Sequence, residues 1–173
     1  MTNESLKKVF EHEKNFWDDI YKKRLLNNKN PKKFLSFWKE EYYKEINFFL
    51  ESLFYKYKYS SLLEAGCGAG KHSLLLDGNI DKTLLDISPA AIEYAKYLSQ
   101  KFKVENVEFI LGNIFEMPFQ KETFDFVWNT GVIEHYEIPD IEIILKEMLR
   151  LTKKNGMIAV GVPNLFSYPT IKA

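Results

Sequence analysis

The sequence predicts an α/β fold with a doubly wound, mostly parallel sheet and a helical N-terminal cap. From Ser60 onward, short apolar runs alternate with segments whose apolar residues recur every three or four positions. This is the pattern of strands alternating with helices. Before residue 58 only the helical pattern occurs, and it is rich in aromatic residues. We therefore expect a helical cap over residues 1–57 and a sheet domain over residues 58–173.

Two helices are expected in the cap. Residues 3–27 carry a stripe of apolar side chains that includes Trp17 and Tyr21, and residues 32–54 repeat apolar side chains in steps of three and four. Between them, Asn27–Pro31 is polar and ends in proline, which is typical of a loop. The aromatic residues of the cap either pack it onto the main domain or line a lid over an apolar or ring-bearing ligand.

Five strands and three helices are expected in the sheet domain. The strands cover residues 59–64, 82–87, 107–111, 124–128 and 157–162, and the helices cover residues 71–76, 89–102 and 139–151. Ser88-Pro89 has the sequence of an N-cap followed by proline at the first helical position. Turns are expected at Asp77–Asn79 and at Asn155-Gly156. Right-handed crossovers through these helices make neighbouring strands parallel.

Composition limits the class of protein. The chain is 46% hydrophobic and 28% charged, values typical of a soluble globular domain. Its formal net charge of zero gives no field that attracts nucleic acid or an anionic membrane, so neither is expected as a partner. A single cysteine excludes an internal disulfide and a multi-cysteine metal site. No apolar run approaches the ~20 residues of a membrane helix. We expect a cytoplasmic protein without a metal.

The ligand of an open parallel sheet lies beyond the carboxyl ends of the strands, where strand order reverses. After the first expected strand come Gly66, Gly68 and Gly70, whose missing side chains let the backbone approach a ligand. The second ends in Asp86 and Ile87. A carboxylate there can accept hydrogen bonds from both hydroxyls of a ribose. The two strand ends together predict a site for a nucleoside-bearing ligand.

The third and fourth strands end in further polar residues. Asn113 and Ile114 follow the third, and an amide beside apolar groups can hold a purine ring by its edge and faces; turn formation is the alternative for Asn113. Asn129 follows the fourth strand and is expected near the ligand. Glu134 and His135 follow it. His135 can take a proton near neutral pH, or it can be a structural histidine at a helix start.

The spacing of the glycines indicates which nucleoside is bound. A dinucleotide site requires G-x-G-x-x-G, with the helix N-terminus facing a pyrophosphate. Here the glycines alternate, and Glu64 stands two residues before the first of them. A carboxylate near the loop disfavours a pyrophosphate and favours a cation. Cys67 is expected to be a small spacer in the loop, and His72 either packs in the following helix or faces the ligand.

This pattern resembles the S-adenosylmethionine site of class I methyltransferases. Leu63–Gly70 is similar to the first motif of that family, and Asp86 matches its ribose-binding acid. Gly112–Phe119 is similar to the segment written G-D-x-x-x-L-P-F, with asparagine in place of the aspartate. Phe124–Tyr136 resembles the F-D-x-V and E-H block of small-molecule enzymes such as those of quinone biosynthesis, and Leu149–Asn164 resembles the L-x-P-G-G strand with its following Pro-Asn.

The resemblance implies a Rossmann-like fold and a methyltransferase that uses S-adenosyl-L-methionine, releases S-adenosyl-L-homocysteine and methylates an O, N or C atom of a small molecule. The cofactor-binding residues that it implies are Glu64, Gly66, Cys67, Gly68, Gly70, His72, Asp86, Ile87, Asn113, Ile114 and Asn129, with His135 and Glu134 as catalytic candidates. Two alternatives remain open: a non-catalytic S-adenosylmethionine-binding subunit that regulates a partner protein, and an NAD-dependent oxidoreductase, which the glycine spacing disfavours.

The sheet of that family has seven strands, whereas this sequence predicts five. We therefore expect the last two strands to be absent and the sheet domain to be incomplete at its C-terminus. An uncovered strand edge can pair with another chain. A homodimer, a partner chain at this edge or marginal stability is the expected consequence.

Overall fold

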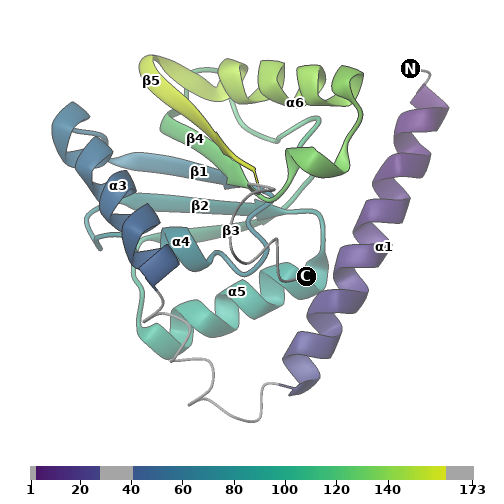
Figure 1. Cartoon of the computed structure of the whole chain (residues 1–173), viewed down its shortest axis with the longest axis horizontal. Coiled ribbons are helices and arrows are strands. Elements are labelled where there is room, and N and C mark those ends of the chain that lie inside the picture. Colours follow the sequence, from purple (N-terminus) through teal and green to yellow (C-terminus); the bar gives the residue numbers. More distant parts are fainter. Residues whose placement is uncertain (1–2, 28–40, 163–173) are drawn as a thin grey trace.

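The computed structural model describes residues 3–27 and 41–162 of the chain (Figure 1). In chain order its elements are α1 (Asn3–Asn27), α3 (Glu41–Tyr57), β1 (Ser61–Ala65), α4 (Lys71–Leu74), β2 (Asp81–Asp86), α5 (Pro89–Phe102), β3 (Val107–Leu111), β4 (Phe124–Thr130), the 3-10 helix η1 (Ile133–His135), α6 (Ile138–Leu151) and β5 (Thr152–Gly161).

The strands form one parallel sheet in the order β3-β2-β1-β4-β5. Because the chain moves outward from β1 to β3 and then returns to the other side of β1, strand order reverses between β1 and β4. Figure 1 shows α4 and α5 on one face of the sheet and α6 on the other. This arrangement confirms the doubly wound α/β fold expected from the sequence. It places the ligand-binding crevice at the carboxyl ends of β1 and β4.

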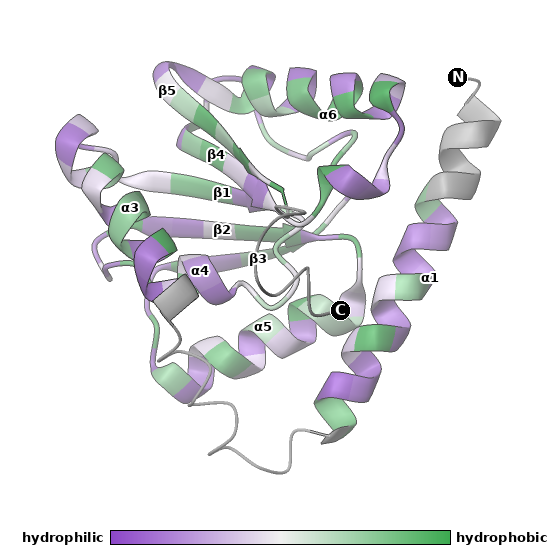
Figure 2. Ribbon diagram, viewed as in Figure 1, coloured by the Kyte–Doolittle hydropathy of each residue, from purple (hydrophilic) through white to green (hydrophobic). Residues whose placement is uncertain are grey.

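Apolar side chains cover both faces of the sheet. On the α6 face, Leu63 of β1 and Val127 of β4 are fully buried in one cluster with Ile144 and Met148 of α6. Ile144 and Met148 are four residues apart and so lie on one side of their helix. Full burial of each aliphatic side chain stabilises the fold by about 1.5–3 kcal/mol. Figure 2 shows hydrophobic residues in the strands and mixed hydrophobic and hydrophilic positions along α5 and α6.

Some element boundaries differ from those expected. Residues 32–40 of the second expected helix lie outside the described residues, and α3 continues past residue 54 to Tyr57. The turn expected at Asn155-Gly156 is wrong, because β5 runs without a break from Thr152. Its register with β4 shifts there: Phe124 pairs with Thr152, but Phe126 pairs with Met157. The polar residues before Met157 are therefore accommodated as an irregularity within the strand.

The helix α1 is attached to the sheet domain at the start of α5. Ser88 caps α5, as predicted, by accepting a hydrogen bond from the Ala91 amide at 3.0 Å, and Pro89 occupies the first turn. Asp18 of α1 accepts hydrogen bonds from the Ser88 hydroxyl at 3.0 Å and the Ala90 amide at 2.9 Å. A carboxylate at a helix N-terminus interacts favourably with the helix dipole. These contacts hold α1 across the carboxyl end of the sheet (Figure 1).

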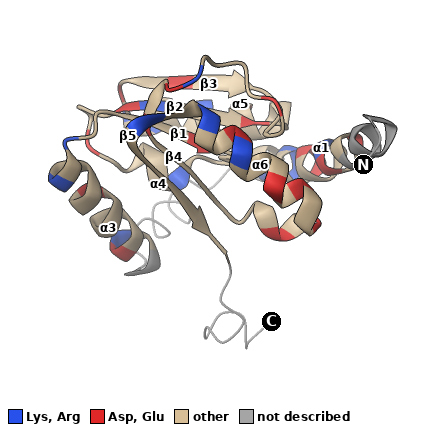
Figure 3. Cartoon of the chain, turned by 90° about the horizontal axis from the view of Figure 1, so that it is seen from above, with Lys and Arg blue, Asp and Glu red and all other residues tan. Residues whose placement is uncertain are grey.

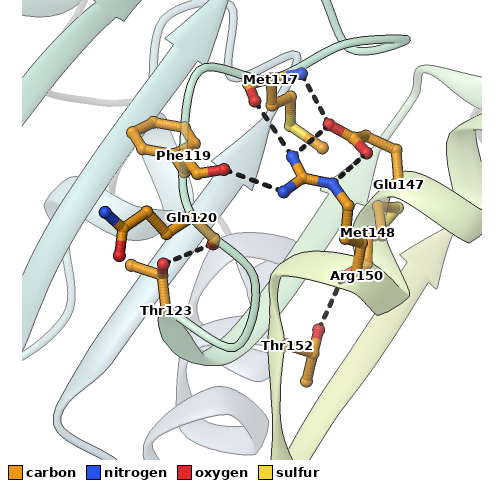
Figure 4. Close-up of polar contacts among 8 residues, drawn as sticks. All are labelled: Met117, Phe119, Gln120, Thr123, Glu147, Met148, Arg150 and Thr152. Atoms are coloured by element: carbon orange, nitrogen blue, oxygen red, sulfur yellow. Dashed lines mark hydrogen bonds and ion pairs between the residues drawn. The ribbon is translucent and has the colours of Figure 1, made fainter.

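The segment between β3 and β4 is held against α6 by a polar network (Figure 4). Arg150 of α6 forms an ion pair with Glu147, with 2.6 Å between Nε and Oε2. Its two Nη atoms donate hydrogen bonds to the carbonyls of Phe119 and Met117, at 2.9 and 3.1 Å. The Met117 amide in turn donates to Glu147 at 2.8 Å. The network fixes a segment that lacks a helix of its own and that supplies one wall of the pocket described next.

Candidate functional site

A pocket lies at the carboxyl ends of β1 to β4. From the sheet domain it is lined by Gly66, Cys67, Gly68, Leu85, Asp86, Ile87, Gly112, Ile114, Thr130, Gly131, Val132, His135 and Tyr136, and from α1 by Glu13, Trp17 and Tyr21. The structure thus brings together Gly66, Cys67, Gly68, Asp86, Ile87, Ile114 and His135 from the residues expected at the site. The other expected residues, Glu64, Gly70, His72, Asn113, Asn129 and Glu134, are not among those that line it.

The turn after β1 depends on glycine at two positions in the pocket wall. Gly66 has φ 79° and Gly68 has φ 53°, in the left-handed region where residues with a Cβ are strained. A Cβ on Gly66 would lie 2.7 Å from Cγ2 of Val132. A Cβ on Gly68 would collide with the Tyr21 hydroxyl. The glycines therefore allow both the turn and the close approach of neighbouring groups, including α1.

Asp86 lies at the end of β2 and fixes the glycine turn. Its Oδ2 accepts a hydrogen bond from the Gly68 amide at 2.7 Å, and its Oδ1 accepts one from the Ser88 amide at 2.9 Å. Burial raises the pKa of this carboxyl, although the hydrogen bonds from these amides oppose the rise. Each carboxylate oxygen has a second lone pair. Asp86 can therefore accept ligand hydroxyls while it holds the turn.

The helix α1 forms one wall of the pocket. Its aromatic residues were expected either to pack on the main domain or to line a lid, but none of them was among the expected site residues. Glu13, Trp17 and Tyr21 are spaced by four residues, so they lie on one side of the helix. The Trp17 Nε1 donates a hydrogen bond to Glu13 Oε2 at 3.0 Å. The Tyr21 side chain is buried and places its hydroxyl over Gly68. The four-residue spacing in the sequence places these side chains on one face of a helix. No pattern in the sequence indicates which surface of the sheet domain that face covers.

His135 lines the pocket from η1, directly after β4. Its ring meets Trp17 edge to face, with 5.3 Å between ring centroids and 80° between planes. The preceding Glu134 is exposed and outside the pocket lining. Of the two catalytic candidates, only His135 is among the residues that line the pocket.

Glu64 is buried inside the fold, away from the pocket lining. Its side chain lies next to Ser73 of α4, and its Oε2 has no hydrogen-bond partner among the described residues. Burial, together with the charge of Asp86, raises the pKa of the Glu64 carboxyl to about 8, against opposing hydrogen bonds at Ser73. In the folded protein this residue is therefore largely a neutral acid at pH 7.

We expect Glu64→Gln to flatten the dependence of stability on pH. A folded pKa of about 8 lies above the unfolded value of 4.5. The contribution of the protonated form is therefore complete below pH 4.5 and is lost as pH rises through 8. Wild-type protein should lose up to about 1.4 kcal/mol per pH unit across this window from this group, while the neutral amide loses none.

Urea unfolding at pH 5, 7 and 8.5 measures this difference. The matched control is Glu108→Gln on β3, whose side chain is exposed. It should keep the wild-type pH dependence. Identical profiles for Glu64→Gln and wild type would show that Glu64 ionises normally in the fold.

Two of the remaining expected residues belong to α4. Gly70, with φ 63°, is its N-cap. His72 points toward α3, where its ring stacks on Tyr43 at 4.8 Å between centroids and its Nδ1 lies 3.4 Å from Asn47 Oδ1. Burial, with the nearby charge of Lys71, lowers the pKa of His72 to about 4. His72 therefore packs between helix and sheet as a neutral residue.

The two asparagines also make contacts within the protein. Asn113 Oδ1 accepts a hydrogen bond from the Phe115 amide at 3.0 Å, which is the geometry of an asparagine that shapes its own turn. Asn129 is fully buried, and its Nδ2 lies 3.4 Å from the Met148 sulfur of α6. In this structure the pocket is therefore bounded near these positions by the neighbouring residues Ile114 and Thr130.

The lining residues fit the cationic nucleoside that the sequence resemblance implies. The glycine turn offers close approach, Asp86 offers acceptors for ribose hydroxyls, and Leu85, Ile87 and Ile114 offer apolar surfaces for a base. No lysine or arginine is among the described lining residues. The pocket therefore contains carboxylates but no fixed cation to balance a pyrophosphate.

The sequence is similar to a family model and to several known proteins. Residues 57–171 match the family model described as a methyltransferase domain. A demethylmenaquinone methyltransferase of Oceanobacillus iheyensis is 30% identical over 113 residues, which cover 61% of this chain and 47% of the relative. A ubiquinone biosynthesis O-methyltransferase of Pelagibacter ubique is 31% identical over 152 residues, which cover 86% of this chain and 60% of the relative.

One solved structure is similar in both fold and sequence. The PH0226 protein from Pyrococcus horikoshii superposes with a TM-score of 0.66 and 30% identity, covering 78% of this chain and 61% of that one. This chain thus spans about half to three fifths of the length of the relatives it matches.

Proposed function

The chain belongs to the methyltransferase-domain family, and on this premise we propose that it is an S-adenosylmethionine-dependent methyltransferase acting on an O, N or C atom of a small molecule. The observation that carries the proposal is the pocket at the carboxyl ends of β1 to β4. There the glycine turn, Asp86 and a set of apolar side chains converge in the arrangement that a nucleoside requires. S-adenosylmethionine supplies a methyl group already activated on a sulfonium.

In this proposal the protein contributes binding, orientation and proton transfer. The backbone of Gly66–Gly68 carries the aminoacyl part of the cofactor, and Asp86 accepts the ribose hydroxyls. Tyr21 and Trp17 of α1 exclude water from the side opposite the sheet. His135 accepts the proton that an oxygen or nitrogen acceptor loses on methylation. Much of the acceleration comes from holding the acceptor in line with the methyl group.

Calorimetric titration tests the cofactor assignment. We expect S-adenosylmethionine and S-adenosylhomocysteine to bind and NAD to give no signal. Binding of NAD with no response to the other two would overturn the assignment. Turnover of S-adenosylmethionine with a panel of small-molecule acceptors then tests catalysis. Binding without turnover of any acceptor favours a non-catalytic S-adenosylmethionine-binding subunit.

The proposal extends to location and association. No helix within residues 3–27 and 41–162 is both long and apolar enough to cross a membrane. We place the protein in the cytoplasm because its sequence has a single cysteine.

β5 is an edge strand of the described sheet. We propose that this edge pairs with a strand of another copy or of a partner chain. Sedimentation of the isolated chain as a monomer at all concentrations would contradict pairing between copies.

A further inference from the structure

The end of the pocket near Glu13 differs in its charged and aromatic groups from the end at the glycine turn. Tyr21 lies against Gly68, and Glu13 stands eight residues earlier on the same helix. Eight residues of α-helix span about 12 Å. Glu13 is therefore well separated from the glycine turn, although it lines the same pocket.

Aromatic rings surround this distant end. Trp17 holds the Glu13 carboxylate through its Nε1 and meets His135 edge to face. Tyr136 lines the pocket beside His135 and packs edge to face on Phe115, with 5.2 Å between ring centroids. Rings of this kind attract cations through their negative faces. A carboxylate among them adds a full negative charge.

The pKa of Tyr136 also indicates that acidic groups lie near this end of the pocket. Burial raises the pKa of the Tyr136 hydroxyl, and the charges of Glu13, Asp86 and Asp140 raise it further. No lysine or arginine is among the described lining residues. Arg24 packs over the Tyr21 ring at 4.8 Å without lining the pocket. Figure 3 shows both acidic and basic residues along α1, and acidic residues near the start of α6.

Glu13 is also accessible enough to meet a ligand. Its side chain is 14% exposed, and its second oxygen, Oε1, lies 3.5 Å from Nδ1 of the exposed His12. The bond from Trp17 occupies only part of the hydrogen-bonding capacity of the carboxylate. Because each carboxylate oxygen has a further lone pair and Glu13 lines the pocket, the carboxylate can also accept hydrogen bonds from a ligand there.

We propose that Glu13, with the rings of Trp17 and Tyr136, forms a subsite that selects acceptors carrying a protonated amine. This inference rests on the proposed methyltransferase function, because it assigns the acceptor end of the same pocket. The ammonium group lies between the Glu13 carboxylate and the two rings. Acceptors that carry a carboxylate or a phosphate at this position are disfavoured, since the described lining offers them no lysine or arginine and places the Glu13 carboxylate against them.

Three matched probes test the selection: tyramine, its alcohol analogue 2-(4-hydroxyphenyl)ethanol, and its carboxylate analogue 3-(4-hydroxyphenyl)propionate. Each is titrated calorimetrically into the full chain, with and without saturating S-adenosylhomocysteine. We expect tyramine to bind at least about tenfold more tightly than the carboxylate, with the alcohol between them, because cation–π and ion-pair contacts favour the ammonium group over the other two.

Two variants test whether Glu13 causes the preference for tyramine over the carboxylate. Glu13→Gln should reduce the ratio between tyramine and the carboxylate to about twofold or less, while Glu11→Gln, an exposed residue of the same helix, should leave it unchanged. Equal binding of the three probes, preference for the carboxylate, absence of tyramine binding, or a preference that survives Glu13→Gln overturns the inference. Failure of S-adenosylhomocysteine to bind overturns the proposed function instead, and the probe series without cofactor still reports on the subsite.

Discussion

Asp86→Ala should weaken the binding of S-adenosylmethionine and S-adenosylhomocysteine about 100-fold, because hydrogen bonds to a charged acceptor contribute about 1.5–3 kcal/mol. Two effects combine in this variant. The ribose hydroxyls lose their carboxylate, and the Gly68 amide loses the acceptor that lies 2.7 Å away. The glycine turn is then free to move away from the geometry that fits the cofactor. Calorimetric titration at constant pH measures the change.

Two further variants make the result interpretable. Asp86→Asn keeps the size of the side chain but offers one carbonyl oxygen where two amides donate, so it should have an intermediate affinity. Asp81→Ala removes an exposed carboxylate from the first position of the same strand and should bind as wild type does. An Asp86→Ala protein that is folded and keeps wild-type affinity would show that the ribose lies elsewhere.

Gly68→Ala is expected to lower both stability and cofactor affinity. The left-handed backbone at φ 53° costs a non-glycine residue about 1–2 kcal/mol, and the new methyl group also collides with the Tyr21 hydroxyl. Relief of the collision requires the Tyr21 side chain, or α1 with it, to move away from the turn. We expect the free energy of unfolding to fall by about 2 kcal/mol and cofactor affinity to fall at least about tenfold.

The chain offers a matched control for this substitution. A Cβ on Gly78, in the turn before β2, meets no atom within 4 Å, so Gly78→Ala should leave both quantities near their wild-type values. Adding Tyr21→Phe to Gly68→Ala removes the colliding oxygen and should restore part of the lost stability. Urea unfolding and calorimetry measure both effects. Equal behaviour of Gly68→Ala and Gly78→Ala would contradict the close packing of α1 on the turn.

Local patterns in the sequence determined the framework of this protein. The alternation of apolar runs with helical periodicity was enough to predict the parallel strands, because neighbouring elements along the chain pair through right-handed crossovers. Ser88 and Pro89 marked the start of α5, since a cap depends on residues within one turn. The alternating glycines and Asp86 marked the pocket, because their positions follow from the ends of two strands.

Long-range packing decided which of the expected side chains reach the pocket. His72 and Asn113 follow strand ends as a ligand-binding residue would, but one packs toward α3 and the other shapes its own turn. Glu64 has the expected place in the motif, yet its carboxyl is buried beside α4. Side-chain direction at such positions depends on the helices that cover the sheet, which periodicity alone does not orient.

The wall formed by α1 is the clearest case of a feature set by tertiary structure. The sequence predicted the helix and its apolar stripe, including Trp17 and Tyr21, from four-residue periodicity. Its position over the site depends on Asp18, whose hydrogen bond to the Ala90 amide joins residues 72 positions apart. A contact at that separation leaves no local pattern in the chain. The sequence by itself therefore determined the strand framework and the glycine turn with Asp86 at the strand ends, and only the packing of α1 decided what closes the pocket.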